Sequence, residues 1–322
     1  MKSSIISTGS YRPKQVVSNF DFEGIMETSD AWIVQRTGIR QRLFEDESSV
    51  RMATEAARNA LENLDASSID CIIVATYTPD SFIPTIANQV RAHLGITNPI
   101  PSFDINAACS GFVYAYQTAH AYIASGIYKR ILVVGVDFNS RYLDFSDRAT
   151  SILFGDGAGA IVMEAGITGS IDCILGGETD TLETIRMQNM SDHGNPFVSR
   201  PLTDSSYFEM KGAEVFKFAV RVMESSVHAI LERNKLTSED VDLVISHQAN
   251  QRILDSGARA LKMPKEKFLS NVAEVGNTSS ASVPLLLDEA NRKGQLKPGM
   301  KIILVAFGGG LTYGTALLEW VA

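Results

Sequence analysis

Two hydrophobic patterns alternate along this chain. Short runs rich in Val, Ile and Leu, bounded by turn residues, predict buried strands. They lie at 70–77, 99–105, 130–138, 159–166, 241–248 and 301–309. Longer segments with a helical apolar period predict helices at 49–64, directly after residue 109, at 213–234 and at 282–294. Near-continuous apolar strands separated by helices are typical of sheets covered on both faces, so the pattern predicts an α/β fold.

The pattern also repeats within the chain. A helix, a polar turn and a buried strand occur at 53–75 and again at 220–246. The strand segment 129–137 likewise resembles 300–308, an offset of 171 residues. We therefore expect two similarly folded halves, 1–168 and 169–322, with pseudo-two-fold symmetry and a shared site where they meet. The polar stretch 166–206 has little periodicity and either covers that site or forms surface loops.

Composition narrows the class of protein. Of the 322 residues, 45% are hydrophobic and 20% are charged, as in ordinary globular proteins. A formal net charge of −8 argues against a general nucleic-acid binder. No apolar run has the length of a membrane span, and the opening MKSSIISTGSY lacks a secretory apolar core, so we expect a cytoplasmic protein without a membrane partner. Three cysteines without C-x-x-C spacing predict neither a disulfide framework nor a metal site.

Cys109 is the first candidate for chemistry. It stands in DINAACSGF (104–112), after a predicted strand, among small residues, and directly before a predicted helix. Small neighbours permit a tight turn, and the positive end of a helix stabilises a thiolate. This context therefore predicts an exposed nucleophile with a lowered pKa. On this stretch alone, a buried structural cysteine is the alternative.

Two further candidates lie in the second half. His247 comes at the end of a predicted strand, where α/β sheets bind ligands. The other four histidines lie in helical or irregular segments that fit structural or exposed roles. Asn277 lies in the small-residue turn that corresponds in numbering to the turn of Cys109. A turn or cap residue is the default interpretation of Asn277, but beside His247 it could stabilise an oxyanion.

Two glycine-rich segments differ in what they allow. FGGG (307–310) follows a buried strand, where bare backbone can approach a ligand and form an oxyanion hole, although an ordinary turn is also possible. FGDGAGA (154–160) leads into a strand instead of opening a helix, so it does not fit a dinucleotide-binding fingerprint.

Taken together, the segments resemble the β-ketoacyl-acyl carrier protein synthase III family, the condensing enzymes that initiate type II fatty acid synthesis. Those that carry the resemblance are TSDAWIVQRTGIRQR (28–42), DINAACSGF, FGDGAGA, SHQANQRI (246–253), GNTSSASVP (276–284) and AFGGGLTYG (306–314). The resemblance implies a thiolase-like fold, with two duplicated α/β halves in α-β-α-β-α layers, and a homodimer. Thiolases use a second cysteine where this chain has none, and chain-elongating synthases use two histidines. Plant-type polyketide synthases share Cys-His-Asn, but the TSDAWIVQRTGIR and HQAN motifs favour the initiating family.

The resemblance also implies a mechanism. Cys109 would take an acyl group from acyl-CoA, and malonyl-acyl carrier protein would then lose CO₂ and condense with the acyl-enzyme to give a 3-oxoacyl product. His247 and Asn277 would hydrogen-bond the thioester oxygen on which charge develops, while the backbone N–H groups of Cys109 and Gly309 would form an oxyanion hole. Phe307 would line the tunnel. The chemistry requires no metal and no permanently bound cofactor.

Family positions assign the coenzyme A contacts in the same way. Trp32 and Arg148 would stack on either side of the adenine, Thr28 and Arg36 would contact the nucleotide end, and Asn250 would meet the pantetheine arm. Both a Trp face and a guanidinium plane can stack on a base. Without the surrounding motif, core packing would be the better interpretation of Trp32.

The carrier protein is acidic, so we expect it to dock on the basic segment 251–267, with Arg252, Arg259 and Lys262 as its contacts. A solvated helix face is the alternative interpretation of these charges.

Ile83 departs from the family pattern, because many members have a phenylalanine there that reaches across the dimer and closes the acyl pocket. The sequence therefore does not distinguish between acetyl, longer straight-chain and branched primers. A related acyltransferase or a secondary-metabolism ketosynthase, with another primer or acceptor, is the alternative function. A non-catalytic scaffold is disfavoured because Cys109 and His247 are both present.

Overall fold

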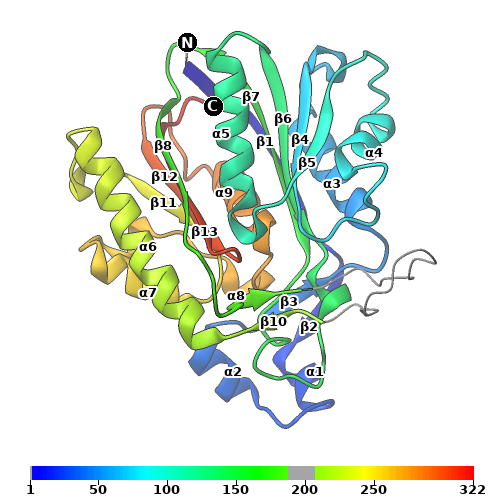
Figure 1. The fold of residues 1–322 in the computed structure, drawn as a ribbon, viewed down its shortest axis with the longest axis vertical. Helices are drawn as coiled ribbons and strands as arrows, with labels where there is room; N and C mark the ends of the chain where they lie inside the picture. Colours follow the sequence, from blue (N-terminus) through cyan, green and yellow to red (C-terminus); the bar gives the residue numbers. More distant parts are fainter. Residues whose placement is uncertain (1, 188–206) are drawn as a thin grey trace, which may run out of the picture.

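The computed structural model describes residues 2–187 and 207–322. Two sheets form its core (Figure 1). The first has the order β1-β7-β6-β4-β5, with the bounds β1 Lys2–Tyr11, β4 Cys71–Ala75, β5 Ser102–Ile105, β6 Arg130–Asp137 and β7 Gly157–Gly166. The second has the order β11-β12-β13-β8, with the bounds β8 Ser170–Gly177, β11 Leu243–Ser246, β12 Lys301–Gly308 and β13 Thr312–Glu319. Two small pairs lie outside them: β2 Gln15–Ser18 with β3 Gln41–Phe44, and β9 Ile185–Arg186 with β10 Glu209–Met210.

Helices cover both sheets and fill the space between them, as Figure 1 shows. α5 and α9 contact both sheets and form the central layer, α3 and α4 pack on the first sheet, and α6 packs on the second beside α7. The result is the expected α-β-α-β-α arrangement. The bounds are α1 Asn19–Glu23, α2 Asp30–Thr37, α3 Ser49–Ala60, α4 Ile86–His93, α5 Gly111–Ala124, α6 Gly212–Arg233, α7 Gln251–Ala260, α8 Val272–Val275 and α9 Ser282–Arg292.

Alternate residues of the strands face two different apolar layers, which explains why the strands are continuous apolar runs in the sequence. In β4, Ile73 faces the central layer, whereas Ile72 and Val74 pack under the outer helices. β12 divides in the same way, with Leu304 in the central cluster and Ile303 in the outer one. Because both faces of β4 and β12 are covered, apolar residues occupy nearly every position, and the helices on either side share the burial.

The internal repeat predicted from the sequence is visible in the pairing. β6 is parallel to β4 and antiparallel to β7, and β12 is parallel to β11 and antiparallel to β13. β1 and β8 then close their sheets as antiparallel partners of β7 and β13. The division at 168 and 169 falls between β7 and β8 and stays a prediction about where the halves separate.

All six predicted strands and all four predicted helices are present, with ends shifted by a few residues. Three strands of the two main sheets were not predicted: β1, β8 and β13. The short strands β2, β3, β9 and β10 were not predicted either. β1 is rich in Ser and Thr, whose hydroxyls find partners inside the protein, as when Thr8 donates to Asp288. β8 lies in the stretch 166–206, which was expected to be irregular, and residues 188–206 of that stretch lie outside the described residues.

Within 2–187 and 207–322, none of the helices combines the length and apolarity needed to cross a membrane.

Close contact between the halves gives the first testable prediction. A Cβ added at Gly135 in β6 would lie 2.5 Å from the carbonyl oxygen of Ser280. We expect Gly135→Ala to destabilise the fold by about 2 kcal/mol or more, since backbone must move. Thermal unfolding would measure the loss. Gly212→Ala is the matched control, because nothing lies within 4 Å of its added Cβ and it begins α6. Equal melting temperatures for the two variants would contradict the account.

Candidate active site

Two matching turns meet between the sheets. Ala108–Ser110 forms a short 3-10 helix that leads into α5, and Ser279–Ala281 forms another that leads into α9. Each begins with a non-glycine residue in the left-handed region, at φ 46° for Ala108 and 51° for Ser279. An asparagine two residues earlier stabilises each turn: Asn106 Oδ1 accepts from the Ala108 N–H at 3.1 Å, and Asn277 Oδ1 accepts from the Ser279 N–H at 2.9 Å. The repeat thus extends to the geometry of the site.

Each turn packs against the end of a strand from the other half. A Cβ on Gly308, the last residue of β12, would lie 2.7 Å from the backbone nitrogen of Cys109. The corresponding strand end in the first half is Asp137, whose carboxylate accepts from the N–H of Ser280 at 2.9 Å. The glycine of FGGG is therefore required at 308, because only bare backbone leaves room for the cysteine.

Cys109 is buried, which differs from the sequence-based expectation. Its exposed fraction is 6%, and burial raises its pKa to about 12 instead of lowering it. A hydrogen bond opposes this shift: the Ser279 hydroxyl donates to the Cys109 sulfur at 3.2 Å. The sequence located the turn before the helix but not the second turn that covers it.

His247 enters the same space from the end of β11. Its backbone N–H donates to the Val305 carbonyl at 2.8 Å, so the strand pairing continues through it. The ring lies edge-on to Phe307 at 5.2 Å between centroids, and Nδ1 is 3.2 Å from the Ser282 hydroxyl. Burial lowers the pKa of His247 to about 3, against a smaller opposing contribution from the Ser279 backbone. The imidazole is therefore neutral at physiological pH.

Asn277 has a fixed orientation. Its Oδ1 accepts from the Ser279 N–H, so its amide nitrogen is the atom that can donate to a ligand. Its backbone pairs with the start of the FGDGAGA segment and the residue before it: the Asn277 N–H donates to the Leu153 carbonyl, and the Gly155 N–H donates to the Asn277 carbonyl. A Cβ on Gly155 would lie 2.2 Å from the Val275 carbonyl oxygen. This motif, for which the sequence suggested no role, thus supports Asn277.

Two cavities meet at Cys109. A cavity of about 120 Å³ is lined by Cys109, His247, Asn277, Phe307 and Asn250, among others. A second, of about 540 Å³, also includes Cys109 and is lined by Tyr77, Ile105 and Gly309 with residues of the 79–85 loop. A group bonded to the sulfur can therefore extend into one cavity while a second reactant enters through the other.

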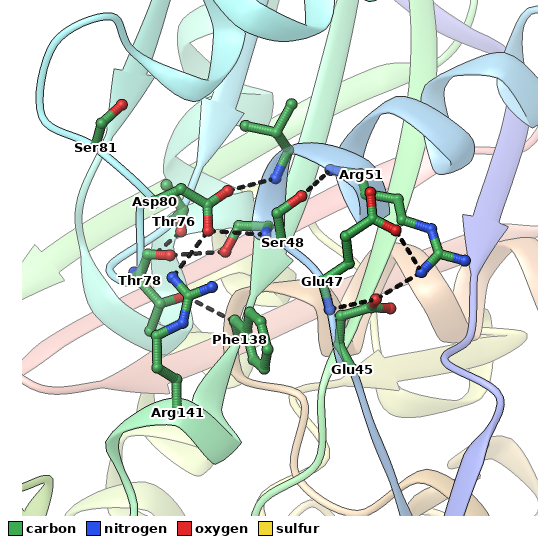
Figure 2. Close-up of polar contacts among 12 residues, drawn as sticks. Glu45, Glu47, Ser48, Arg51, Thr76, Thr78, Asp80, Ser81, Phe138 and Arg141 are labelled. Carbon is green, nitrogen blue, oxygen red and sulfur yellow. Dashed lines mark hydrogen bonds and ion pairs between the residues drawn. The ribbon is translucent and has the colours of Figure 1, made fainter.

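Polar contacts hold the outer wall of the larger cavity (Figure 2). The Asp80 carboxylate accepts from the N–H groups of Ser49 and Val50 at the start of α3, at 3.1 and 2.8 Å. It also pairs with Arg141 at 2.9 Å, and that guanidinium lies 4.3 Å from the ring centroid of Phe138. The neighbours of Asp80 in the chain, Pro79 and Ser81, line the cavity. These contacts, which sequence reasoning missed, fix the wall relative to α3.

The residues predicted to bind coenzyme A lie on a different surface, near the small cavity. Trp32 is half-buried in α2, with the guanidinium carbons of Arg36 and Arg148 at 4.7 and 4.9 Å from its ring centroid. The Thr28 hydroxyl is buried without a hydrogen-bond partner among the described residues. Asn250 is the N-cap of α7, where its side-chain oxygen accepts from Ile253 N–H, and it lines the small cavity.

The other predicted residues lie outside both cavities. Arg252 and Arg259 are exposed on α7, and Lys262 is exposed just after it. Ile83 is 90% exposed and is not among the residues that line the two cavities at Cys109. Within the described part of the chain, no group of three or more His, Cys, Asp or Glu side chains could hold a metal ion.

Comparison with known proteins identifies the family. Models of 3-oxoacyl-[acyl-carrier-protein] synthase III match residues 103–177 and, for its C-terminal part, residues 231–320. A β-ketoacyl-[acyl-carrier-protein] synthase III from Clostridium acetobutylicum is 44% identical over 98% of both chains. The chain belongs to the β-ketoacyl-[acyl-carrier-protein] synthase III family. It is an acyltransferase of the condensing type that initiates fatty acid synthesis.

Solved structures of this family share the fold. The 3-oxoacyl-[acyl-carrier-protein] synthase III from Aquifex aeolicus has a TM-score of 0.90 and 42% identity, covering 99% of this chain and all of its own. The priming β-ketosynthase of the R1128 polyketide pathway has a TM-score of 0.91 and 33% identity, covering 99% of this chain and 96% of its own. The thiolase-like fold predicted from the sequence is thereby confirmed.

The protonation state of His247 can be tested directly. Because its pKa is lowered to about 3, adding a proton to the ring requires a pH far below neutral. We expect the imidazole to stay neutral between about pH 5 and about pH 8, across the range in which an unperturbed histidine titrates. Ring ¹⁵N chemical shifts of labelled protein, assigned with a His247→Asn variant, would measure this. A His247 signal that titrates near pH 6.5 would contradict the neutral-donor account.

Proposed function

We propose that this chain joins an acyl-CoA primer to malonyl-acyl carrier protein through an acyl-enzyme on Cys109. The observation that carries the proposal is the position of Cys109 where two cavities meet, one of them lined by both His247 and Asn277. The larger cavity would hold the acyl chain. The smaller one would admit the pantetheine arm, first of coenzyme A and then of the carrier.

In the first half-reaction the Cys109 sulfur attacks the thioester carbonyl carbon of the acyl-CoA. A C–S bond forms, the bond to coenzyme A breaks, and the proton lost by Cys109 leaves with the coenzyme A thiol. The backbone N–H groups of Cys109 and Gly309 would stabilise the tetrahedral oxyanion. With the cysteine pKa raised by burial, the thiol is protonated at rest, so proton loss accompanies attack.

In the second half-reaction malonyl-carrier loses CO₂, and the electron pair of the broken C–C bond moves toward the thioester oxygen. His247 and Asn277 would donate hydrogen bonds to that oxygen. Both donors are neutral, and His247 stays so because burial lowers its pKa. The enolate carbon then attacks the acyl carbonyl, a C–C bond forms, and the bond to Cys109 breaks. The Cys109 thiolate takes up a proton from water, and the 3-oxoacyl-carrier leaves.

Coenzyme A would bind across α2 and the start of α7. In the structure the Arg148 guanidinium already lies over the Trp32 ring, so an adenine would enter by separating two groups that both stack well on a base. Arg36 and the buried Thr28 hydroxyl would meet the nucleotide end, and the amide nitrogen of Asn250 would meet the pantetheine arm. No tightly held cofactor takes part.

An acidic carrier protein would dock beside this entrance, on the surface that includes Arg252, Arg259 and Lys262. Opposite charges steer such an encounter although the chain as a whole is acidic. We also propose a cytoplasmic homodimer. Phe82 and Ile83, at 56% and 90% exposure, form an apolar tip beside the larger cavity that a second copy would cover.

A second candidate is a priming ketosynthase of a specialised pathway, with a primer other than the fatty acid starter. The similarity to the R1128 priming enzyme favours it, as does Ile83, which in the proposed homodimer would replace a phenylalanine at the acyl pocket of the second copy. Comparing the acyl-CoAs that the enzyme accepts would separate the two.

Two substitutions separate the half-reactions. We expect Cys109→Ala to abolish acyl-enzyme formation, because no other nucleophile lies where the two cavities meet within the described residues. Asn277→Ala should acylate within about threefold of the parent rate and lose condensation by at least about a hundredfold, as when an oxyanion donor is removed. Quenched-flow measurement of bound acyl group and 3-oxoacyl product would test both. Acyl-enzyme on the Cys109→Ala protein would refute the nucleophile assignment.

The wall of the larger cavity can be tested through primer choice. Arg141→Ala removes one of the contacts of Asp80 but leaves its bonds to the start of α3. We expect acylation by longer acyl-CoAs to rise severalfold relative to shorter ones, because the 79–85 loop can move outward. Mass spectrometry of the enzyme after competition between a longer and a shorter acyl-CoA would measure the ratio of the two acyl-enzymes. Arg58→Ala, which removes an exposed pair with Glu55, is the control that should leave it unchanged. An unchanged ratio in Arg141→Ala would show that the pair does not position the wall.

A further inference from the structure

Ser279 has no role in the mechanism above, yet it contacts both reacting side chains. Its hydroxyl donates to the Cys109 sulfur at 3.2 Å, and its backbone opposes the lowering of the His247 pKa. It is 1% exposed and adopts a φ of 51°. A serine costs energy in this conformation where glycine would not.

Neighbouring contacts leave Ser279 little freedom. Its own N–H is bound to Asn277 Oδ1. The next residue, Ser280, donates its N–H and its hydroxyl to the Asp137 carboxylate at 2.9 and 2.6 Å. Asp137 is itself fully buried and accepts from Thr76 Oγ1, the Tyr77 N–H and Thr78 Oγ1. The strand end of one half thus fixes the turn of the other.

We propose that Ser279 is a further catalytic residue, whose hydroxyl stabilises the Cys109 sulfur as it becomes a thiolate. A buried sulfur anion has little solvent around it, so one oriented O–H donor matters more there than in water. The hydroxyl keeps its proton throughout, because it donates a hydrogen bond and transfers nothing. The same group would stabilise the sulfur again when it leaves the acyl-enzyme.

The titratable groups near Cys109 do not favour its ionisation. Asp137 and Tyr77 lie close enough to couple electrostatically with the cysteine, and the nearby His247 is neutral. The Ser279 hydroxyl, which donates to the sulfur, also lowers the pKa of Asp137. Removing the hydroxyl should therefore destabilise the thiolate in two ways, by loss of a donor and by exposure to the charge of Asp137.

The inference deepens the proposed function and rests on Cys109 being its nucleophile, but its test requires no turnover. Iodoacetamide alkylates the thiolate form, and peptide mapping separates Cys109 from Cys71 and Cys173. We expect Ser279→Ala to slow alkylation of Cys109 about tenfold at every pH from about 7 to about 9, which corresponds to one pKa unit. Cys173, half-buried in β8, is the internal reference whose rate should not change.

Ser279→Gly is the matched variant. It removes the same hydroxyl but relieves the left-handed strain that alanine keeps. Equal slowing of Cys109 alkylation in both variants would support the proposed role of the hydroxyl. Slowing in Ser279→Ala alone would assign the effect to backbone strain and overturn the proposal, as would unchanged alkylation in both.

A second readout excludes general disruption of the site. In a Cys109→Ala background there is no sulfur to stabilise, so adding Ser279→Ala should leave malonyl-carrier decarboxylation within about twofold. A further large loss would show that Ser279 acts through His247 or Asn277, and the proposal would fall. Failure of the proposed function would look different, because acyl-enzyme would then form on the Cys109→Ala protein.

Discussion

The site depends on backbone contact between each half's turn and the other half's strand end. Gly308 lies against Cys109, and Gly135 lies against Ser280, at distances that leave no room for a side chain. Asp137 adds a buried carboxylate that accepts hydrogen bonds from both halves. These contacts bring Cys109 from the first half and Asn277 and His247 from the second into one space. Neither half could form the site alone.

The same close packing sets the electrostatics. Burial raises the pKa of Cys109 and lowers that of His247, so both reactive side chains are uncharged before substrate arrives. A thiolate paired with a charged histidine would react readily, but the thiolate would also be more easily oxidised. With a buried neutral pair, charge appears only as the thioester is attacked or decarboxylated, where oriented donors can stabilise it. The asparagine and the serine turns supply such donors.

The sequence predicted much of the fold and the site, because the hydrophobic pattern with its internal repeat and the short motifs were both clear. Buried strands between helices and the offset of 171 residues indicated the two-half α/β fold, and the motifs located Cys109, His247 and Asn277 on turns that the structure brings together. What failed depended on contacts between distant segments. β1 was missed because its serines and threonines are satisfied by partners far along the chain, and the exposure of Cys109 was wrong because the covering turn lies 170 residues away. The roles of Asp80, Asp137 and Ser279 could not be predicted either, because they also depend on contacts between segments that are far apart in the sequence.

The most direct test of the account is a single-turnover chase followed by intact-protein mass spectrometry. The enzyme is first mixed with an acyl-CoA, and malonyl-acyl carrier protein is then added. We expect one acyl mass on the peptide that contains Cys109, which disappears at the rate at which a 3-oxoacyl-carrier product forms. An acyl mass that persists in the presence of malonyl-carrier, or product that forms without any acylated Cys109, would contradict condensation through this cysteine.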